Sequence, residues 1–304
     1  MLLAAALGCR GAPIPESQRY PAGTPLTARF LTVDGTRIRY VDTGSGPAVV
    51  LVHGLAASLY SWRYTILPLA RAGYRVVAFD NRGFGFSEKP ASGYRNDDYG
   101  RLLFALLDSL HVGDAVLVGH SMGGEIAAEA ALDRPDRVRG LVLVDAAGLG
   151  VRWPFMLRVA HWPIVGALFD GFRGRTATGR ILKALYGDPS RVTEEDVDQY
   201  YAPLAQPGFG RALRGVLRNF HFDALRGRLS GLTTPTLVMW GTRDRLIPPQ
   251  VGESMVSELP RALLVRFPGA GHDVPEETPD AFNRTLIAFL QNGLPRGPEN
   301  LASR

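Results

Sequence analysis

The sequence predicts an α/β fold: a mostly parallel, twisted sheet with helices on both faces and a helical cap inserted after the sixth strand. Short runs of branched apolar residues alternate with segments of helical periodicity. Strands that are apolar along their whole length are typical of parallel sheets covered on both faces. The alternation stops near residue 148 and resumes near residue 233, and the stretch between contains helical segments but no convincing strand.

The elements follow in order along the chain. A hairpin is predicted over residues 30–41, because Asp34 and Gly35 form a dipeptide that favours a two-residue turn. Buried strands are predicted at 48–52, 75–79, 116–118, 140–144, 235–240 and 262–267. Helical spacing covers 60–72, 96–110 and 125–132 in the flanking parts, and 181–186, 192–201 and 209–222 in the insertion.

These elements divide the chain into four parts. Residues 28–147 and 233–292 form the predicted α/β core. Residues 148–232 form the cap, which we expect to lie over the carboxyl ends of the strands, where open α/β sheets bind ligands. Residues 1–27 are a signal-like or linker segment, and residues 293–304 are a C-terminal tail.

The net positive charge of the chain comes from the predicted cap. The apolar content of 46% and charged content of 21% are typical of a globular protein. Residues 148–232 hold 12 of the 34 basic and 7 of the 29 acidic residues, which accounts for the whole net charge of +5. The basic residues are interleaved with apolar ones and match no nucleic-acid-binding module, so no nucleic-acid partner is expected. A solvated helical surface and an attraction for anionic substrates or lipid headgroups both stay open.

Cys9 is the only cysteine, so neither an intramolecular disulfide nor a thiolate metal site is expected. An apolar run and a small residue precede Cys9, in a pattern that resembles the lipobox of bacterial lipoproteins. However, no Lys or Arg precedes the run, and only eight residues stand before the cysteine. Two interpretations remain: a lipidated, membrane-anchored protein of the cell envelope, and a cytoplasmic protein with a frayed apolar terminus. No segment reaches the roughly 20 apolar residues of a membrane span.

The motif that organises the chain is Gly-x-Ser-x-Gly at residues 119–123, between a predicted strand and a predicted helix. A turn this tight leaves no room for side chains at Gly119 and Gly123. It lifts Ser121 above the sheet edge and aims the Met122 amide, at the positive end of the helix dipole, at an oxyanion formed there. The alternative is an ordinary glycine-rich turn that contains a serine.

A nucleophilic serine needs a base and a group that orients the base. His272 lies in a glycine-rich loop after the strand at 262–267, and Asp244 follows the strand at 235–240. The order serine, aspartate, histidine is the one that accompanies this turn. Asp145, at the end of the strand at 140–144, is an alternative orienting acid, and we favour Asp244.

With these motifs in place, the chain resembles the α/β-hydrolases that carry a helical cap, over about residues 28–292. The resemblance implies that residues 53–55 form the oxyanion loop, so that the amides of Leu55 and Met122 bind the oxyanion. The supporting residues it implies are His53, Gly54, Gly119 and Gly123. It also matches residues 80–87 to an architectural loop, in which Asp80 and Arg82 hold the structure together.

Other titratable residues near these motifs are expected to support the structure or face solvent rather than to react. His53 is expected to order the oxyanion loop rather than act as a base, and His120 is expected to point away from the reacting serine. Asp273, Glu276 and Glu277 are expected to be solvated charges beside the histidine loop. No metal-ligand spacing or phosphate loop is present, so no cofactor and no metal are inferred.

The predicted function is a serine hydrolase that cleaves a carboxylic ester through an acyl-enzyme, as carboxylesterases and lipases do. Ser121 argues against the dehalogenases and epoxide hydrolases of this fold, which carry aspartate at the turn. The substrate is a small acyl compound with an apolar part; the oligomeric state is not indicated. The alternatives are a carbon–carbon hydrolase of a ring-fission-type diketone acid, with Arg152 pairing to its carboxylate, and a ligand-binding protein that keeps the triad with negligible turnover.

Overall fold

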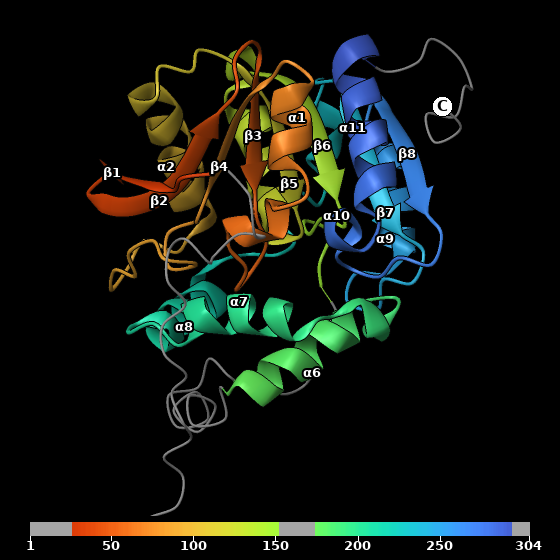
Figure 1. Ribbon diagram of the computed structural model, residues 1–304. Helices are drawn as coiled ribbons and strands as arrows, with labels where there is room; N and C mark the ends of the chain where they lie inside the picture. Colours follow the sequence, from red (N-terminus) through yellow and green to blue (C-terminus); the bar gives the residue numbers. More distant parts are fainter. Residues whose placement is uncertain (1–25, 152–173, 294–304) are drawn as a thin grey trace, which may run out of the picture.

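An eight-stranded sheet forms the centre of the molecule (Figure 1). The computed structural model describes residues 26–151 and 174–293, so Cys9 and Arg152 lie outside the described residues. The strands are β1 (Arg29–Val33), β2 (Thr36–Thr43), β3 (Ala48–Val52), β4 (Arg75–Phe79), β5 (Ala115–His120), β6 (Val138–Val144), β7 (Thr236–Gly241) and β8 (Ala262–Phe267). Their order is β1-β2-β4-β3-β5-β6-β7-β8, and only the pairs β1–β2 and β2–β4 are antiparallel. The predicted α/β fold with a mostly parallel sheet is confirmed.

The α-helices are α1 (Ile66–Arg71), α2 (Asn96–Ser109), α3 (Met122–Asp133), α6 (Arg175–Leu185), α7 (Glu194–Leu204), α8 (Phe209–Asn219), α9 (Pro249–Glu258), α10 (Val274–Glu277) and α11 (Pro279–Asn292). The 3-10 turns are η2 (Leu59–Trp62), η3 (Pro135–Arg137), η4 (Pro189–Arg191) and η5 (Leu229–Gly231). Within residues 26–151 and 174–293, no helix is long and apolar enough to cross a membrane.

The single helix expected over residues 60–72 is wrong, because this segment forms η2 and then the short helix α1. The break has a local cause at the carbonyl of Tyr60. That carbonyl accepts both the backbone amide of Arg63, at 3.0 Å, and the Arg63 guanidinium, at 3.2 Å. An α-helix would instead need it to accept the amide four residues on.

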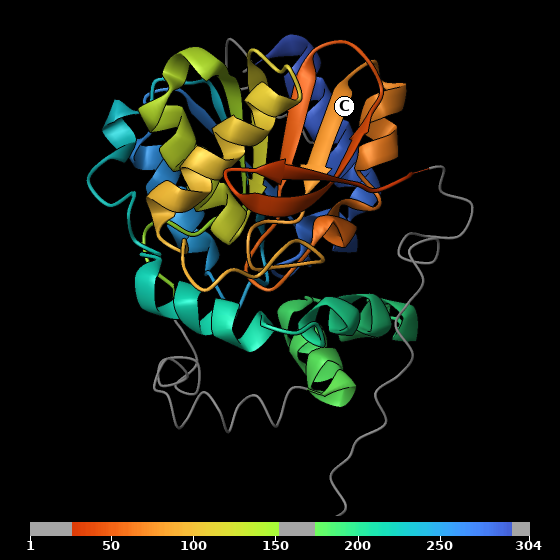
Figure 2. The ribbon, with the colours of Figure 1, turned by 90° about the vertical axis from the view of Figure 1, so that its left-hand side faces the viewer.

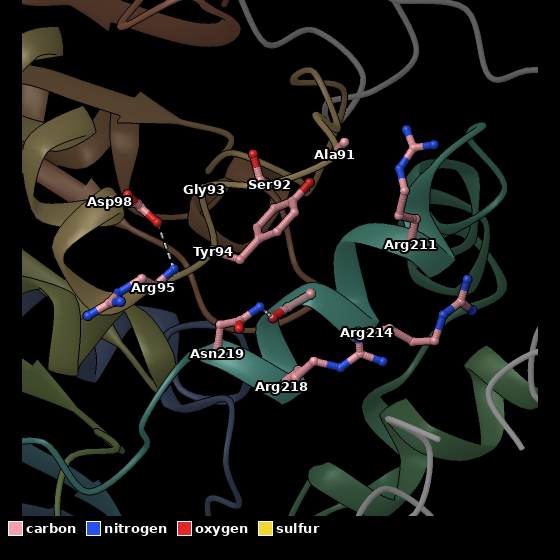
Figure 3. Close-up of a pocket in the computed structure, with 11 residues that line it drawn as sticks. Ala91, Ser92, Gly93, Tyr94, Arg95, Asp98, Arg211, Arg214, Arg218 and Asn219 are labelled. Carbon is pink, nitrogen blue, oxygen red and sulfur yellow. Dashed lines mark hydrogen bonds between the residues drawn. The ribbon is translucent and has the colours of Figure 1, made fainter. Parts of the chain in front are cut away.

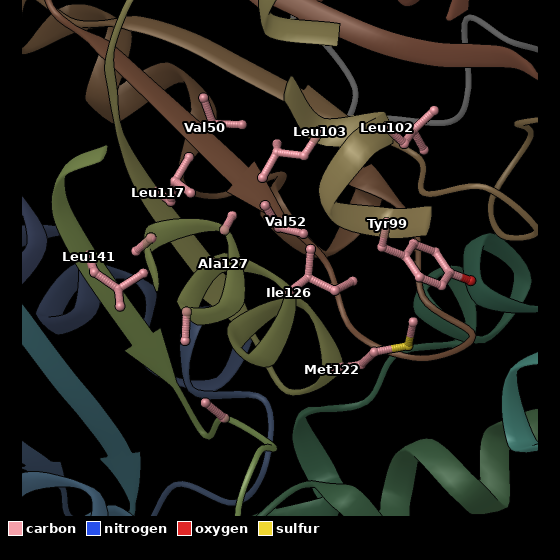
Figure 4. Packing of buried hydrophobic residues seen from close by; sticks show 14 of the residues in the cluster. Val50, Val52, Tyr99, Leu102, Leu103, Leu117, Met122, Ile126, Ala127 and Leu141 are labelled. Carbon is pink, nitrogen blue, oxygen red and sulfur yellow. The ribbon is translucent and has the colours of Figure 1, made fainter. Parts of the chain in front are cut away.

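Two hydrophobic cores lie on the two faces of the sheet. One face packs against α2, α3 and α9, and the other against α1 and α11. The central strand β3 contributes to both, with Val50 and Val52 on the first face and Val49 and Leu51 on the second. Figure 4 shows Ile126 and Ala127 of α3 among side chains of β3, β5 and α2. The helix that follows Ser121 is therefore held firmly on the sheet.

The sheet order places a switch point between β3 and β5, since the chain proceeds outward in opposite directions on the two sides of it. Ligands of open α/β sheets bind beyond the carboxyl ends of strands at such a point. The residues after β3 and β5 there are His53 and Ser121.

Helices α6, α7 and α8 lie across the carboxyl-end edge of the sheet, outside the two helical layers (Figures 1 and 2). The chain that leaves β6 and the chain that returns to β7 run side by side there. The amide of Gly148 donates to the carbonyl of Phe222 at 3.2 Å, and the amide of Leu225 donates to the carbonyl of Gly148 at 3.0 Å. The segments that follow β6 and precede β7 are thus hydrogen-bonded to each other.

Candidate active site

Ser121 stands at a sharp turn between β5 and α3, with φ 54° and ψ −121°. A non-glycine residue in this region is strained by about 1–3 kcal/mol and persists only where its surroundings hold it. Here the amide of Ser121 donates to Val144 at 2.9 Å, and its carbonyl accepts the amides of Gly124 and Ala147 at 2.9 and 3.0 Å. The side chain is 9% exposed, so the hydroxyl is held at a nearly enclosed position.

The two glycines of the motif are required by close backbone contacts. A Cβ on Gly119 would lie 2.2 Å from the carbonyl oxygen of Gly123, and a Cβ on Gly123 would lie 2.2 Å from the carbonyl oxygen of Val52. Neither contact can relax by a side-chain movement, because both partners are backbone atoms. Any larger residue must therefore displace β3 or α3.

The structure brings Ser121, His272 and Asp244 into one hydrogen-bonded relay. His272 Nε2 is 2.9 Å from Ser121 Oγ, and His272 Nδ1 is 2.7 Å from Asp244 Oδ2. A carboxylate can only accept, so Nδ1 carries the proton and Nε2 accepts the serine hydroxyl. Asp244 Oδ1 accepts the amides of Leu246 and Ile247 at 2.8 and 2.9 Å, which fixes the carboxylate.

The electrostatics of this relay favour a basic imidazole. Burial lowers the pKa of His272, but the charge and hydrogen bond of Asp244, together with the charges of Asp273 and Glu277, outweigh it, so the pKa of His272 is raised above its ordinary value. The arrangement can accept a proton from Ser121 and hold it on a histidine stabilised by Asp244.

Asp145, the alternative acid, does not reach His272. It is fully buried, and its Oδ1 accepts the amide of Gly241 at 2.8 Å. Burial, followed by the charge of Asp244, raises the pKa of Asp145 well above its ordinary range. A protonated Asp145 would leave Asp244 as the charged carboxylate beside the imidazole.

His53 has both ring nitrogens hydrogen-bonded, one within the loop after β3 and the other to the loop after β4. Its Nε2 accepts the amide of Asn81 at 2.8 Å, so its Nδ1 carries the proton and donates to the carbonyl of Gly54, also at 2.8 Å. In a trans peptide the C=O and the following N–H point in opposite directions. Fixing the Gly54 carbonyl therefore fixes the direction of the Leu55 amide.

The oxyanion loop approaches the serine closely. A Cβ on Gly54 would lie 3.0 Å from Ser121 Cβ, so this position also favours glycine. The Met122 amide belongs to the first residue of α3, where amides have no acceptor within the helix. The chain thus provides two candidate donors: the Leu55 amide, next to the glycine that approaches Ser121, and the Met122 amide, which follows Ser121 directly.

The His120 side chain contacts the main chain of the loop that carries His272 instead of the serine hydroxyl. Its Nε2 donates to the backbone carbonyl of His272 at 2.7 Å, with the two rings 5.0 Å apart. Burial, followed by the charge on His272, lowers the pKa of His120 to about 3. A neutral His120 therefore supports the main chain that carries His272.

The expectation that Asp273, Glu276 and Glu277 are solvated charges is wrong, because all three are buried. Burial, followed by the charge of Glu276, raises the pKa of Asp273 to about 8. Glu276 pairs with Arg63 at 2.5 Å and accepts the hydroxyl of Tyr186 at 2.9 Å. Sequence reasoning missed the buried state of Glu276 because its partners Tyr186 and Arg63 lie 90 and 213 residues away along the chain.

Arg63 connects this cluster to the inserted helices. Its guanidinium pairs with Asp196 of α7 at 2.7 Å as well as with Glu276 of α10. Asp196 also accepts the hydroxyl of Tyr60 at 3.2 Å. These buried pairs connect α7, and through Tyr186 the end of α6, to the core, while Arg63 Nε has no hydrogen-bond partner among the described residues.

The loop over residues 80–87 is held by its own polar side chains. Asp80 accepts the amides of Leu59 and Phe86, both at 2.7 Å, and Arg39 at 3.3 Å. Arg82 donates to Thr36 at 2.8 Å. Asp80 and Arg82 therefore connect loops and strands, with no contact to the relay among these hydrogen bonds.

A cavity of about 300 Å³ opens between α8 and the loop at residues 91–95 (Figure 3). Arg211, Arg214 and Arg218 of α8 line it, and neither Ser121 nor His272 does. Over residues 26–151 and 174–293, no group of three His, Cys, Asp or Glu side chains is arranged to hold a metal ion.

Comparison with known proteins places this chain among hydrolases. The model of the alpha/beta hydrolase fold family matches residues 47–279. A 2-hydroxy-6-oxononadienedioate/2-hydroxy-6-oxononatrienedioate hydrolase of Burkholderia vietnamiensis is 34% identical over 285 residues, covering 87% of this chain and 96% of the relative.

Two solved structures are also similar. A mutant of the meta-cleavage product hydrolase CumD of Pseudomonas fluorescens, complexed with acetates, superposes with a TM-score of 0.76 at 28% identity, covering 88% of this chain and 98% of that one. A membrane phospholipase A superposes with a TM-score of 0.75 at 27% identity, covering 91% of this chain and 88% of that one.

Proposed function

The chain belongs to the alpha/beta hydrolase family, and we propose that it is a serine hydrolase that cleaves a carbon–carbon bond in a ring-fission-type keto acid. The observation that carries the proposal is the relay from Asp244 through His272 to Ser121 at the strained turn. Similarity to carbon–carbon hydrolases supports the choice of bond.

The first half of the proposed reaction forms an acyl-enzyme. Ser121 Oγ attacks the substrate carbonyl while its proton moves to His272 Nε2, and the Leu55 and Met122 amides stabilise the oxyanion. When the tetrahedral intermediate collapses, the carbon–carbon bond breaks and its electron pair leaves with the carbon fragment. In a substrate in its 2-oxo form, that pair is delocalised into the conjugated keto acid, and His272 returns the proton to it.

The second half releases the acid. A water molecule gives a proton to His272 as its oxygen adds to the acyl carbon, and Ser121 leaves and recovers the proton. An ester would pass through the same steps with an alkoxide in place of the carbanion. The same catalytic residues can therefore cleave a carbon–carbon bond or an ester bond. Which of the two substrates is used depends on the pocket around these residues.

Ester hydrolysis is the second candidate, favoured by the similarity to a phospholipase A. Partly buried apolar side chains also lie on the loops near the carboxyl ends of the strands: Leu55, Leu149, Val151, Phe222 and Leu246. They suit a small acyl substrate with an apolar part. The carboxylate partner suggested for the keto acid, Arg152, lies outside the described residues.

A direct comparison of substrates tests the proposal. The purified chain would be assayed with 2-hydroxy-6-oxo-6-phenylhexa-2,4-dienoate, following loss of the dienolate absorbance and formation of benzoate, and with p-nitrophenyl esters of several chain lengths. We expect kcat/KM for the dienoate to exceed that for every ester, and both activities to disappear in Ser121→Ala and His272→Ala. Faster ester turnover would establish the second candidate. Binding without turnover of either class would favour a ligand-binding protein.

A further inference from the structure

His272 is held by its main chain on two sides. Its amide donates to the carbonyl of Leu185, the last residue of α6, at 2.8 Å, and its carbonyl accepts His120 at 2.7 Å. One of these anchors belongs to the inserted helices and the other to the turn at Ser121. The position of the imidazole therefore depends on where the end of α6 lies.

Glu277 joins the same two segments with a single side chain. Its Oε1 accepts the amide of Gly271, which precedes His272, at 2.7 Å. Its Oε2 accepts the amides of Gly187 at 2.8 Å and Asp188 at 3.4 Å, just after α6. Glu277 is 1% exposed, so water does not compete for these bonds. Both oxygens accept backbone N–H groups. A carboxylate offers two acceptor oxygens for this purpose, whereas the amide of glutamine offers only one.

The segments that Glu277 joins are in direct backbone contact. A Cβ on Gly187 would lie 2.1 Å from the carbonyl oxygen of Gly269, and a Cβ on Gly271 would lie 2.2 Å from that of Leu185. Two glycines thus let the histidine loop and the end of α6 pack with no side chain between them. Glu277 forms hydrogen bonds to both of the segments that meet at this contact.

We propose that Glu277 is a positioning residue, which sets His272 relative to Ser121 by tying the histidine loop to the end of α6. The inference rests on the proposed function, because it assigns Glu277 a task in the reaction of Ser121. The proposal also implies that the inserted helices help to set the position of His272 relative to Ser121. Misplacing a reacting group by about 1 Å can cost on the order of 10²-fold in rate.

The test uses a fluorophosphonate probe on the full chain, with the maximal labelling rate and the half-saturating probe concentration measured separately. Glu277→Gln keeps the size of the side chain but turns an NH₂ group toward one backbone donor. We expect the maximal labelling rate to fall by about 10- to 100-fold while the half-saturating concentration stays near that of the wild type. A general loss of structure would lower the amount of labelled protein without this split.

Two further variants support the interpretation. Glu277→Asp keeps the charge but is one methylene too short to reach both segments, so it should show the same split, and it is the variant to measure if Glu277→Gln does not fold. Glu129→Gln is the matched control, since Glu129 is also buried and accepts Arg228 of the inserted segment at 3.4 Å, while this partner belongs to neither of the segments that Glu277 joins. It should lower stability and leave the maximal labelling rate within about threefold.

The tie to α6 is tested by combining Glu277→Gln with Tyr186→Phe, which removes the hydrogen bond from the end of α6 to Glu276. If Glu277 acts through the end of α6, the double variant labels about as slowly as the slower single variant. Rates that multiply would refute the tie. Folded Glu277 variants that label like the wild type would overturn the positioning role itself. A wild-type chain that does not label at all would instead refute the proposed serine hydrolase.

Discussion

Asp244→Asn should deprive His272 of the acceptor nitrogen that faces Ser121, without unfolding the protein. In the native site Oδ1 of Asp244 accepts two backbone amides, from Leu246 and Ile247, at 2.8 and 2.9 Å. An asparagine must keep its carbonyl oxygen there, because its NH₂ group would otherwise face two donors. The NH₂ group is then directed at His272 Nδ1, which must become an acceptor.

The consequence is that the proton of the imidazole moves to Nε2, which faces Ser121 Oγ. A protonated Nε2 cannot take the hydroxyl proton, so kcat should fall by roughly 10⁴-fold, the loss that a wrong tautomer causes in a serine–histidine–aspartate enzyme. The assay is steady-state turnover, with thermal unfolding to show that the variant is folded. Asp145→Asn is the control, because it replaces a buried acid whose pKa is raised with a neutral isostere, and it should retain activity within about threefold. A folded Asp244→Asn variant within tenfold of the wild type, or a larger loss in Asp145→Asn, would refute the reasoning.

Three more results are expected. Gly123→Ala should lose most of its soluble, labelled protein and lower the melting temperature, because its Cβ would lie 2.2 Å from a backbone oxygen; an unchanged melting temperature would contradict this. The acid limb of the kcat/KM profile should have its midpoint above about 6.5, since the pKa of His272 is raised and the base must be neutral; a midpoint below 6.5 would contradict the direction. Arg63→Met should lower the free energy of unfolding in urea by about 3–5 kcal/mol, because two buried carboxylates lose their partner; Arg175→Met, which removes two exposed pairs, should lower it by no more than about 1 kcal/mol.

The parts of the site that sequence reasoning located are those with local signals. The turn at Ser121 requires an apolar strand, two glycines and a helix within about 20 residues, and all are visible in the sequence. His272 and Asp244 each follow a strand of the parallel sheet, and the topology then brings them to one edge.

The remaining features depend on partners that are distant in the sequence. Glu277 ties Gly271 to Gly187, which lies 90 residues away along the chain, and no periodicity relates these positions. The Arg63 guanidinium that contacts the Tyr60 carbonyl at the break between η2 and α1 is held by buried partners on α7 and α10. Charge alone predicts solvent exposure for such residues, and only the packed structure shows the pairing that makes burial tolerable.

Labelling by a fluorophosphonate, followed by intact mass measurement and peptide mapping, tests most directly whether Ser121 is an activated nucleophile. The account predicts one adduct on the folded wild type, located on Ser121, and no adduct on Ser121→Ala or His272→Ala. A folded wild type that stays unlabelled, or an adduct that persists in Ser121→Ala, would contradict it.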